Sequence, residues 1–363
     1  MKTLLLGDVS ATQATESVFE RLDIETLFTD TLLLFEGNDI NFVNLECAIT
    51  THEKAIEKFG PPLKACAETA DVLKKIGVNC CGLSNNHVFD YGKKGIKDTM
   101  ENLERVGIPY TGFGENYEDS RKNFVFEKNG EKVCIITVCE HEYSYALEDR
   151  MGSRPFDEFD TMKDIRDAKK ENDRVIVIYH GGKEHCKYPS PRLRRVCRAM
   201  ADNGADVVLC QHSHCIGCYE QFEGCHILYG QGNSHFLKLP GFQMPETWNS
   251  ALMVKYDTKT HEIEFVPTVN EENGITLAKG EEKETILKEF AKRNEELANG
   301  EWKKGWHDFC ISVQGLYKRI IRDACNENST DEQNALFGHF LDCEAHTDVW
   351  RELFPTYNKT NEK

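Results

Sequence analysis

Side chains able to bind metal ions follow short apolar runs at five places in this sequence. The stretches are TLLLGD, NFVNLE, CGLSNNH, VIVIYH and DVVLCQHSH, and the residues concerned are Asp8, Glu46, Asn86, His87, His180, His212 and His214. Two carboxylates, one amide and four imidazoles supply the mixed oxygen and nitrogen ligands that suit manganese, iron or zinc. A carboxylate can bridge two ions, and paired ions about 3.5–4 Å apart form the clamp used for in-line displacement at phosphorus.

Each candidate also has a common structural role. An aspartate after a glycine, such as Asp8, often forms a turn. Asn86 fits a helix cap or a turn, and His180 alone is typical of a hydrogen-bonded structural histidine. His212 and His214 alternate along an extended segment, so their rings should point to opposite sides and serve one ion each. The metal site is favoured because compatible ligands end five separate runs.

A rival metal site lies next to the last of these runs. Cys215 and Cys218 form a C-x-x-C directly after His214, which is compatible with a structural zinc site that includes His212 or His214. Such a site would use the histidines locally and leave the carboxylates without a shared purpose. The fifteen cysteines of the chain are otherwise expected to be reduced core thiols, because nothing in the sequence indicates export.

Short apolar runs alternate with amphipathic segments through the first half of the chain, which predicts a layered α/β fold. In a βα unit the residue just past the strand lies at the carboxyl edge of the sheet, so the candidates should meet at one rim. Asn129 and Gly130 stand between two alternating runs and predict a hairpin, so the sheet should be mixed.

The second half continues the alternation and then changes character. We expect a helix at 160–171, a strand at 174–180, a helix opened by Ser190 and Pro191, and strands at 205–214, 251–257 and 261–267. From about Glu281 the sequence is charged and helical. The chain should therefore divide into an α/β domain at 1–270 and a helical C-terminal appendage at 271–363. Three apolar residues at helical spacing should pack this appendage on the domain: Ile286, Phe290 and Leu297.

Composition limits the possible partners. The chain has 363 residues and a formal net charge of -17, which opposes non-specific binding to nucleic acid or to an anionic membrane. An anionic substrate must therefore meet a local positive site. The apolar run at the N-terminus, Leu4 to Leu6, is too short for a signal peptide, and no run of about 18 apolar residues occurs. These features predict a soluble, cytoplasmic protein without a membrane span.

The segment after Pro191 is unusually basic for so acidic a chain. It carries Arg192, Arg194, Arg195 and Arg198. One interpretation is an anion-binding face beside the metals, suited to phosphate or to a chain of γ-linked carboxylates. The other, which we favour, is a helix face paired with nearby acidic residues.

The ordered motifs resemble the CapA family of capsule and poly-γ-glutamate synthesis proteins, a branch of the calcineurin-like metallophosphoesterases. The matching pieces are GDV (7–9), NLE (44–46), SNNHVFDYG (84–92), HGGKE (180–184), GADVVLCQHSH (204–214) and YGQGNSHF (229–236). They fall within about residues 1–265, and the helical C-terminal third contributes nothing. The resemblance implies a layered metallophosphoesterase-like β-sandwich flanked by helices.

The resemblance also implies a role for each site residue. Asp8 and His214 would hold one divalent ion, Glu46 would bridge, and a second ion would be held by Asn86, His180 and His212. His87 would face the substrate, stabilising charge on the phosphoryl group or protonating the leaving oxygen, a role for an imidazole that titrates near neutrality. Asp90 would orient the His87 ring or cap a turn.

Two departures from the wider phosphoesterase pattern affect the expected function. The usual Asp-x-His of the first strand is Asp8-Val9-Ser10 here, and Glu46 replaces the usual bridging aspartate. Our first hypothesis is a metal-dependent hydrolase that acts on a phosphoester or a polyglutamate-type amide through a dinuclear centre and a metal-bound water. The alternative is a non-catalytic polyanion-binding or assembly protein of capsule or poly-γ-glutamate synthesis.

Overall fold

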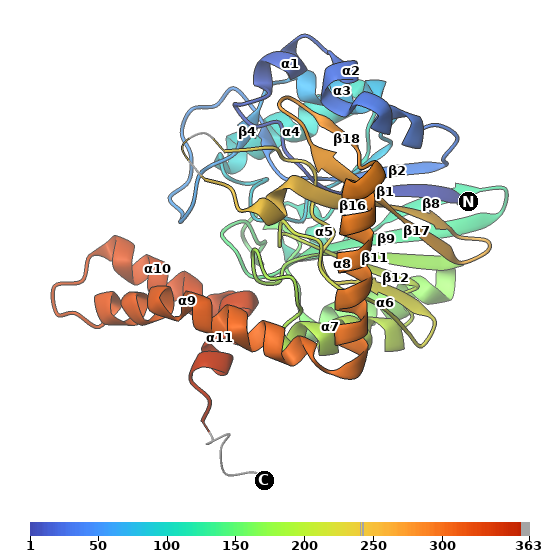
Figure 1. Ribbon diagram of the computed structural model, residues 1–363. Coiled ribbons are helices and arrows are strands. Elements are labelled where there is room, and N and C mark those ends of the chain that lie inside the picture. The colour runs from blue at the N-terminus through green and yellow to red at the C-terminus, as the bar shows by residue number, and fades with distance from the viewer. Residues whose placement is uncertain (240, 242, 357–363) are drawn as a thin grey trace.

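Two β-sheets stack face to face in the computed structural model, and helices cover their outer sides (Figure 1). The structure describes residues 1–239, 241 and 243–356. The predicted mixed α/β class is confirmed.

The first sheet carries the N-terminus and the strands near the end of the α/β body. Its order is β18 (Ile275–Leu277), β17 (Glu262–Asn270), β16 (Ser250–Asp257), β1 (Lys2–Val9), β2 (Ile40–Leu45), β5 (Cys80–Gly82) and β6 (Tyr110–Thr111), with β15 (Asn233–His235) also paired to β1. β1, β2, β5 and β6 run parallel, whereas β16, β17 and β18 pair antiparallel. The sheet therefore extends past residue 270, into the segment that the sequence assigned to the appendage.

The second sheet is formed by the middle of the chain. Its order is β13 (Tyr219–Phe222), β14 (Cys225–Leu228), β12 (Val207–Gln211), β11 (Arg174–His180), β9 (Glu131–Cys139) and β8 (Phe124–Lys128). The predicted hairpin joins β8 to β9. Asn129 and Gly130 both have positive φ, 54° and 82°, as the tight hairpin turn requires. Two small pairs lie outside the main sheets: β3 (Ala48–Ile49) with β4 (Lys64–Ala65), and β7 (Phe113–Gly114) with β10 (Gly152–Ser153).

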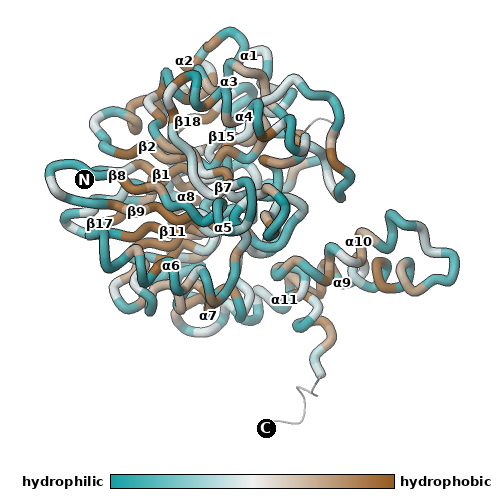
Figure 2. Tube along the Cα trace, turned by 180° about the vertical axis from the view of Figure 1, so that it is seen from behind, coloured by the Kyte–Doolittle hydropathy of each residue, from teal (hydrophilic) through white to brown (hydrophobic). Residues whose placement is uncertain are grey.

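An apolar layer fills the space between the two sheets. It joins Leu5 and Phe42 of the first sheet to Ile135, Ile178 and Leu209 of the second, all buried. Figure 2 shows hydrophobic residues along β9 and β11. Central strands covered on both faces read as continuous apolar runs, which is why these strands were visible in the sequence.

Helices bury the outer face of each sheet. The first sheet is covered by α1 (Glu16–Glu20), α2 (Ile24–Phe28), α3 (Glu68–Lys75) and α4 (Gly92–Val106), and the second by α6 (Glu158–Glu171) and α7 (Pro191–Asp202) (Figure 1). Shorter helices lie in the connections: the 3₁₀ helices η1 (Thr29–Leu34) and η2 (Glu246–Asn249), and α5 (Tyr117–Ser120). The predicted start of α7 is confirmed, because the Ser190 side chain accepts a hydrogen bond from Leu193 N.

Four C-terminal helices follow the sheets: α8 (Gly280–Asn299), α9 (Trp302–Ala324), α10 (Asp331–Asp342) and α11 (Glu344–Leu353). α8 lies along the body, where Phe290 joins the layer between the sheets and Leu297 packs with the core beside α7. α9, α10 and α11 form a bundle, which we call the arm, that projects from the body (Figure 1). Within the described residues, no helix is both long and apolar enough to cross a membrane.

Candidate metal centre

Glu46 lies at the centre of two overlapping groups of potential metal ligands. One group joins Glu46 to His180 and His212, and the other joins Glu46 to Asp8 and His214. Within each group the candidate ligand atoms lie within 4.8 Å of one another, and all five residues are buried. The structure thus brings together side chains that lie far apart in the sequence.

Strand ends position these residues, but the strands belong to two sheets. Asp8 lies in β1 and Glu46 follows β2 of the first sheet, whereas His180 ends β11 and His212 follows β12 of the second. The expectation of one rim on one sheet was wrong, because the two sheets stack with their carboxyl ends adjacent. Gly7 permits the close approach of β1 to residue 232, since a Cβ there would lie 2.2 Å from the carbonyl oxygen of Gly232.

Amide side chains hold the ligand candidates in place. Asn86 Oδ1 lies 2.9 Å from His180 Nε2, so the predicted amide ligand adjoins the group of Glu46, His180 and His212. Asn44 Nδ2 donates to Asp8 Oδ1 at 2.8 Å and lies 3.1 Å from His180 Nδ1. Asn233 Oδ1 lies 2.8 Å from His214 Nδ1. The run NFVNLE offered Asn44 beside Glu46 as a further group able to bind metal, although Asn44 was not counted among the ligands, and Asn233 was given no role.

Several buried polar atoms of this cluster have no hydrogen-bond partner among the described residues and are available to a cation. Within the described part of the chain, both carboxylate oxygens of Glu46 and Nδ1 of His212 are buried without a hydrogen-bond partner. Burial, together with the charge of Asp8, raises the pKa of Glu46 well above its usual value. A buried, unpartnered carboxylate is costly, and a bound cation would remove that cost. The residues therefore fit a divalent metal ion.

Asp8 differs from Glu46 in its electrostatic setting. Burial opposes its ionisation, but hydrogen bonding to His180 and the charges of His180 and His214 lower the pKa of Asp8 to about 2. Asp8 is thus stably ionised, whereas the charge of Glu46 needs a compensating positive charge.

The loop after β12 has an unusual backbone. His212 and His214 have φ angles of 79° and 53°, in the left-handed region that non-glycine residues seldom adopt. The expectation of an extended segment with alternating rings was wrong for this reason. The two rings nevertheless separate, with centroids 6.1 Å apart, and each histidine falls in a different ligand group.

His87 lies beside the centre and is held by a buried acid. Its Nδ1 is 2.7 Å from Asp90 Oδ2, and Lys58 Nζ is 2.6 Å from Asp90 Oδ1 and 3.0 Å from the carbonyl oxygen of Asn86. Asp90 therefore orients the imidazole. Burial lowers the pKa of His87, and the charge of Lys58 lowers it further against the opposing effect of Asp90, so the ring is neutral at pH 7. Lys58 had no recognisable signal in the sequence.

The rival zinc site gains no support. Among the described residues, Cys215 and Cys218 join no group of potential metal ligands. Burial raises the pKa of Cys215 to about 11 and that of Cys218 to about 12, so both are neutral thiols at pH 7. The C-x-x-C is part of the packed core beneath the loop of His214.

The basic helix face pairs with acids, as the favoured interpretation held. Arg194 and Arg198 both bind Glu220, at 3.0 and 2.5 Å, and Arg192 binds Glu140 and Asp348. Arg192 is buried and not solvent-facing. Three of the four predicted arginines are therefore paired with carboxylates of the protein itself, whereas Arg195 is exposed.

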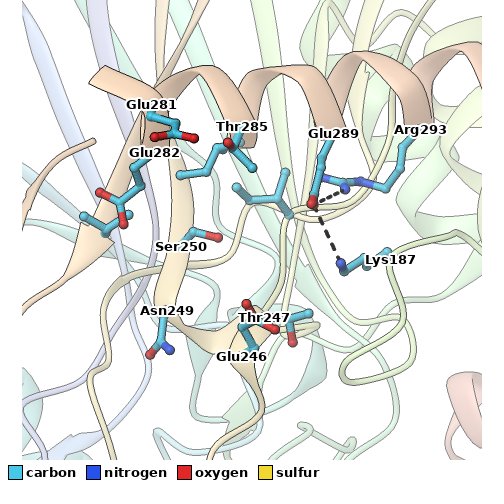
Figure 3. A pocket seen from close by; sticks show the side chains of 13 residues that line it. Lys187, Glu246, Thr247, Asn249, Ser250, Glu281, Glu282, Thr285, Glu289 and Arg293 are labelled. Atoms are coloured by element: carbon cyan, nitrogen blue, oxygen red, sulfur yellow. Dashed lines mark hydrogen bonds and ion pairs between the residues drawn. The ribbon is translucent and has the colours of Figure 1, made fainter. Parts of the chain in front are cut away.

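A cavity of about 580 Å³ lies between α8, η2 and the loop that carries Lys187 (Figure 3). Figure 3 shows Glu289 of α8 pointing toward Lys187 and Arg293, with which it forms ion pairs. None of the metal-ligand candidates lines this cavity. Its lining is mainly acidic, since Glu246, Glu281 and Glu282 accompany Glu289, and we assign it no chemistry.

Sequence comparison agrees with the motifs that surround the centre. The family described as "Bacterial capsule synthesis protein PGA_cap" matches residues 2–237. The chain belongs to this family. The resemblance to CapA proteins is thereby confirmed, and all the metal-ligand candidates, with His87 and Asp90, fall inside the matched range, whereas α8 to α11 lie outside it.

Curated relatives carry CapA names. The chain is 29% identical over 242 residues to the "Capsule biosynthesis protein CapA" of Bacillus anthracis, covering 64% of this chain and 59% of that protein. It is 27% identical over 301 residues to the "PGA biosynthesis protein CapA" of Bacillus subtilis (strain 168), covering 79% of this chain and 77% of that protein. A solved structure of a hypothetical protein from Thermus thermophilus covers 76% of this chain and 96% of its own, at 16% identity and a TM-score of 0.43, too slight a likeness to carry an argument.

Proposed function

We propose that this member of the PGA_cap family is a metal-dependent hydrolase with a calcineurin-like metallophosphoesterase body, whose sheet ends with β18 (Ile275–Leu277), and a helical appendage that begins at α8 (Gly280–Asn299). Its substrate is a phosphoester or a polyglutamate-type amide. The observation that carries the proposal is Glu46, a buried carboxylate that has no hydrogen-bond partner among the described residues and is shared by two groups of potential ligands. When bound, two divalent ions would supply Lewis acidity and lower the pKa of a bound water.

The assignment of ligands follows the two groups. Asp8 and His214 hold one ion, Asn86, His180 and His212 hold the other, and Glu46 serves both. Asn44 and Asn233 orient Asp8, His180 and His214 through their amide groups. Manganese, zinc and iron all suit such a set of donors.

His87 supplies the proton chemistry in this proposal. Because Asp90 accepts the Nδ1 proton of the neutral ring, Nε2 is free to bind a proton from solvent, and the protonated ring then passes that proton to the leaving oxygen. Lys58 balances the charge of Asp90 and ties it to the backbone of Asn86. Lys58 thus holds both the loop that carries Asn86 and, through Asp90, the ring of His87.

The family and the printed names of the relatives favour an anionic polymer as substrate. Capsule and poly-γ-glutamate chains are polyanions, and this chain has a net charge of -17, so positive groups near the centre must attract the substrate. Lys183 is one such group, because it lies in the loop after β11, three residues beyond the ligand candidate His180. The competing proposal, a non-catalytic polyanion-binding protein, is favoured by one observation: Ser10 replaces a histidine ligand, and its buried Oγ has no hydrogen-bond partner in the described chain.

The test distinguishes residues that bind the metal from His87, which is proposed to contact the substrate. His87→Ala should leave metal content unchanged and lower turnover about 10²–10⁴-fold. Glu46→Ala, Asn86→Ala and His180→Ala should each reduce metal occupancy. The assay uses an aryl phosphodiester and a γ-glutamyl oligomer with manganese or zinc supplied, and His307→Ala, an exposed histidine on α9, is the matched control.

Two results would count against the proposal. Loss of metal from the His87 variant would make this residue a ligand and undo its assignment. Full metal loading of the wild type without turnover of either substrate would favour the binding protein over the hydrolase.

A further inference from the structure

The arm joins the body through a set of buried ionic contacts, which we call the joint. His141, just after β9, contacts the Glu344 carboxylate of α11 through its N and Nδ1, at 2.8 and 2.6 Å. Arg192 of α7 lies between Glu140, at 2.6 Å, and Asp348 of α11, at 3.0 Å. The first turn of α7 and the arm are therefore in direct contact.

A cavity of about 380 Å³ lies beside the joint, between α7, α9 and α11. It is lined by Arg192 and Arg195 of α7, Trp306 of α9, and Asp348, Arg351 and Glu352 of α11. None of the metal-ligand candidates lines it, so this cavity is separate from the candidate metal centre. Its volume falls in the range of small-molecule sites, about 300–1,000 Å³.

Two buried side chains of this lining carry hydrogen-bond donors without an acceptor. Trp306 is 2% exposed and Arg192 is 8% exposed. Within the described residues, neither Trp306 Nε1 nor Arg192 Nη1 has a hydrogen-bond partner. An indole N–H and a guanidinium group can only donate, and a buried donor left unsatisfied is costly. An oxygen acceptor from outside the chain would remove that cost.

Arg195 adds a charged donor to the same cavity. It lies three residues after Arg192, so both side chains are on one face of α7. In the part of the chain that the structure describes, the exposed Arg195 forms no ion pair, whereas Arg194 and Arg198 both bind Glu220. α7 begins at this end of the cavity, where the positive end of its dipole favours an anion.

The two acids of the lining already have partners. Asp348 accepts hydrogen bonds from Ser190 Oγ and Arg192 Nε, and Arg351 Nη1 lies 3.5 Å from its Oδ1. Glu352 Oε1 lies 2.7 Å from His307 Nδ1. The Arg351 side chain is 70% exposed, so its guanidinium group remains accessible to a ligand. The hydrogen-bonding groups that remain unused in this lining, among the described residues, are therefore donors.

We infer that this cavity is an anion-binding site, with Arg195 and Arg351 as its charged donors and the Trp306 indole as a neutral donor. The ligand is a carboxylate or a phosphoryl group, because a planar guanidinium group matches the oxygens of either. The inference does not depend on the proposed hydrolase. Because α7 lies within residues 2–237 and the arm lies outside them, the site combines the part that defines the family with a part that does not.

The experiment measures anion binding to the full chain by calorimetry, before metal removal and after chelation followed by dialysis. The probes are inorganic phosphate and a γ-glutamyl oligomer. We expect the chelated wild type to bind at least one of them. Arg195→Gln should weaken this binding about tenfold, as for a lost hydrogen bond to a charged group, and Trp306→Phe about fivefold. The control is Arg322→Gln, which changes an exposed arginine of α9 outside the cavity and should bind normally.

The outcomes decide whether the cavity is the site. Weaker binding to Arg195→Gln with an unchanged control supports the inference, and the probe affected identifies the anionic group. Equal binding to Arg195→Gln and wild type overturns it, as does an equal loss in Arg322→Gln, which would reflect net charge alone. Binding that disappears with the metal belongs to the metal centre and also overturns the inference. If Trp306→Phe lowers the melting temperature, the Arg195 variant decides.

Discussion

Two clusters of acidic side chains among the described residues, one around Glu46 and one around Glu140, differ in how their charges are matched. The candidate metal centre is built around Glu46, and the joint between arm and body contains a group with similar spacing, Glu140, Cys343 and Glu344. In the joint, Glu140 binds Arg192, the Tyr179 hydroxyl and Ala345 N. In the described chain, the Glu46 carboxylate has no such partner.

The comparison shows that spacing alone does not define a metal site. His141 holds the pKa of Glu344 below its usual value although burial opposes this, whereas burial raises the pKa of Glu46 unopposed by any hydrogen bond among the described residues. A paired carboxylate is already compensated and serves as a structural contact. An unpaired one needs a cation from outside the chain.

The largest effect should come from breaking the matched cluster. Arg192→Ala would leave Glu140 and Asp348 buried without their main cation, so we expect a loss of about 3–5 kcal/mol in the free energy of unfolding. Urea denaturation measures it. Arg198→Ala on the same helix is the control, because its pair with Glu220 is partly exposed and should cost at most about 1 kcal/mol. Equal losses for the two variants would mean that the joint is no more than a surface contact.

Removing bound metal should lower the melting temperature through the cluster around Glu46 and not through the joint. At a free metal concentration about 100 times Kd, each occupied site stabilises the folded state by about 2.7 kcal/mol. Adding manganese to the chelated wild type should therefore raise its melting temperature. Glu46→Gln should abolish this response and Glu344→Gln, in the joint, should retain it. If Glu344→Gln also lost the rise in melting temperature, the ion would bind in the joint, which would contradict the assignment to Glu46.

The smallest effect concerns the contact of Glu220 with Arg194 and Arg198, which belongs to neither cluster. Arg198 and Arg194 lower the pKa of Glu220 from 4.5 to about 2, against burial. A depressed folded-state pKa contributes stability above the unfolded value and loses it as the pH falls. Glu220→Gln should thus be less stable than wild type by about 1 kcal/mol at pH 6, and the difference should shrink as the pH falls from 4.5 toward 2. A difference that grows on acidification would contradict the assigned pairing.

Much of the centre could be predicted because its residues end strands. Asp8, Glu46, His180 and His212 each follow a continuous apolar run, and buried strands of this kind are recognisable in a sequence. The left-handed backbone of His212 and His214 could not be predicted, since it depends on how the loop fits between two sheets. The alternation of elements predicted one rim of one sheet, although the family resemblance implied a sandwich, and the ligand candidates lie at strand ends of two stacked sheets.

Contacts between distant segments were beyond the sequence. Lys58 reaches Asp90 across 32 positions, and Glu142 meets Cys343 across 201. No local pattern marks a lysine that will be buried beside a carboxylate, or a helix that will dock on a distant part of the body. The spacing of Phe290 and Leu297 predicted that α8 would be amphipathic, and both are buried, but nothing in it indicated where α9 to α11 would lie.

The central claim is that Glu46 serves two ions, and elemental analysis of the protein purified without added metal tests it most directly. We predict two equivalents of manganese, zinc or iron per chain in the wild type, with occupancy reduced by Asp8→Ala and most strongly by Glu46→Ala. Cys215→Ser should leave the metal content unchanged. A single zinc that survives loss of Asp8 and Glu46 but disappears with Cys215 would contradict the account and identify a structural zinc site instead.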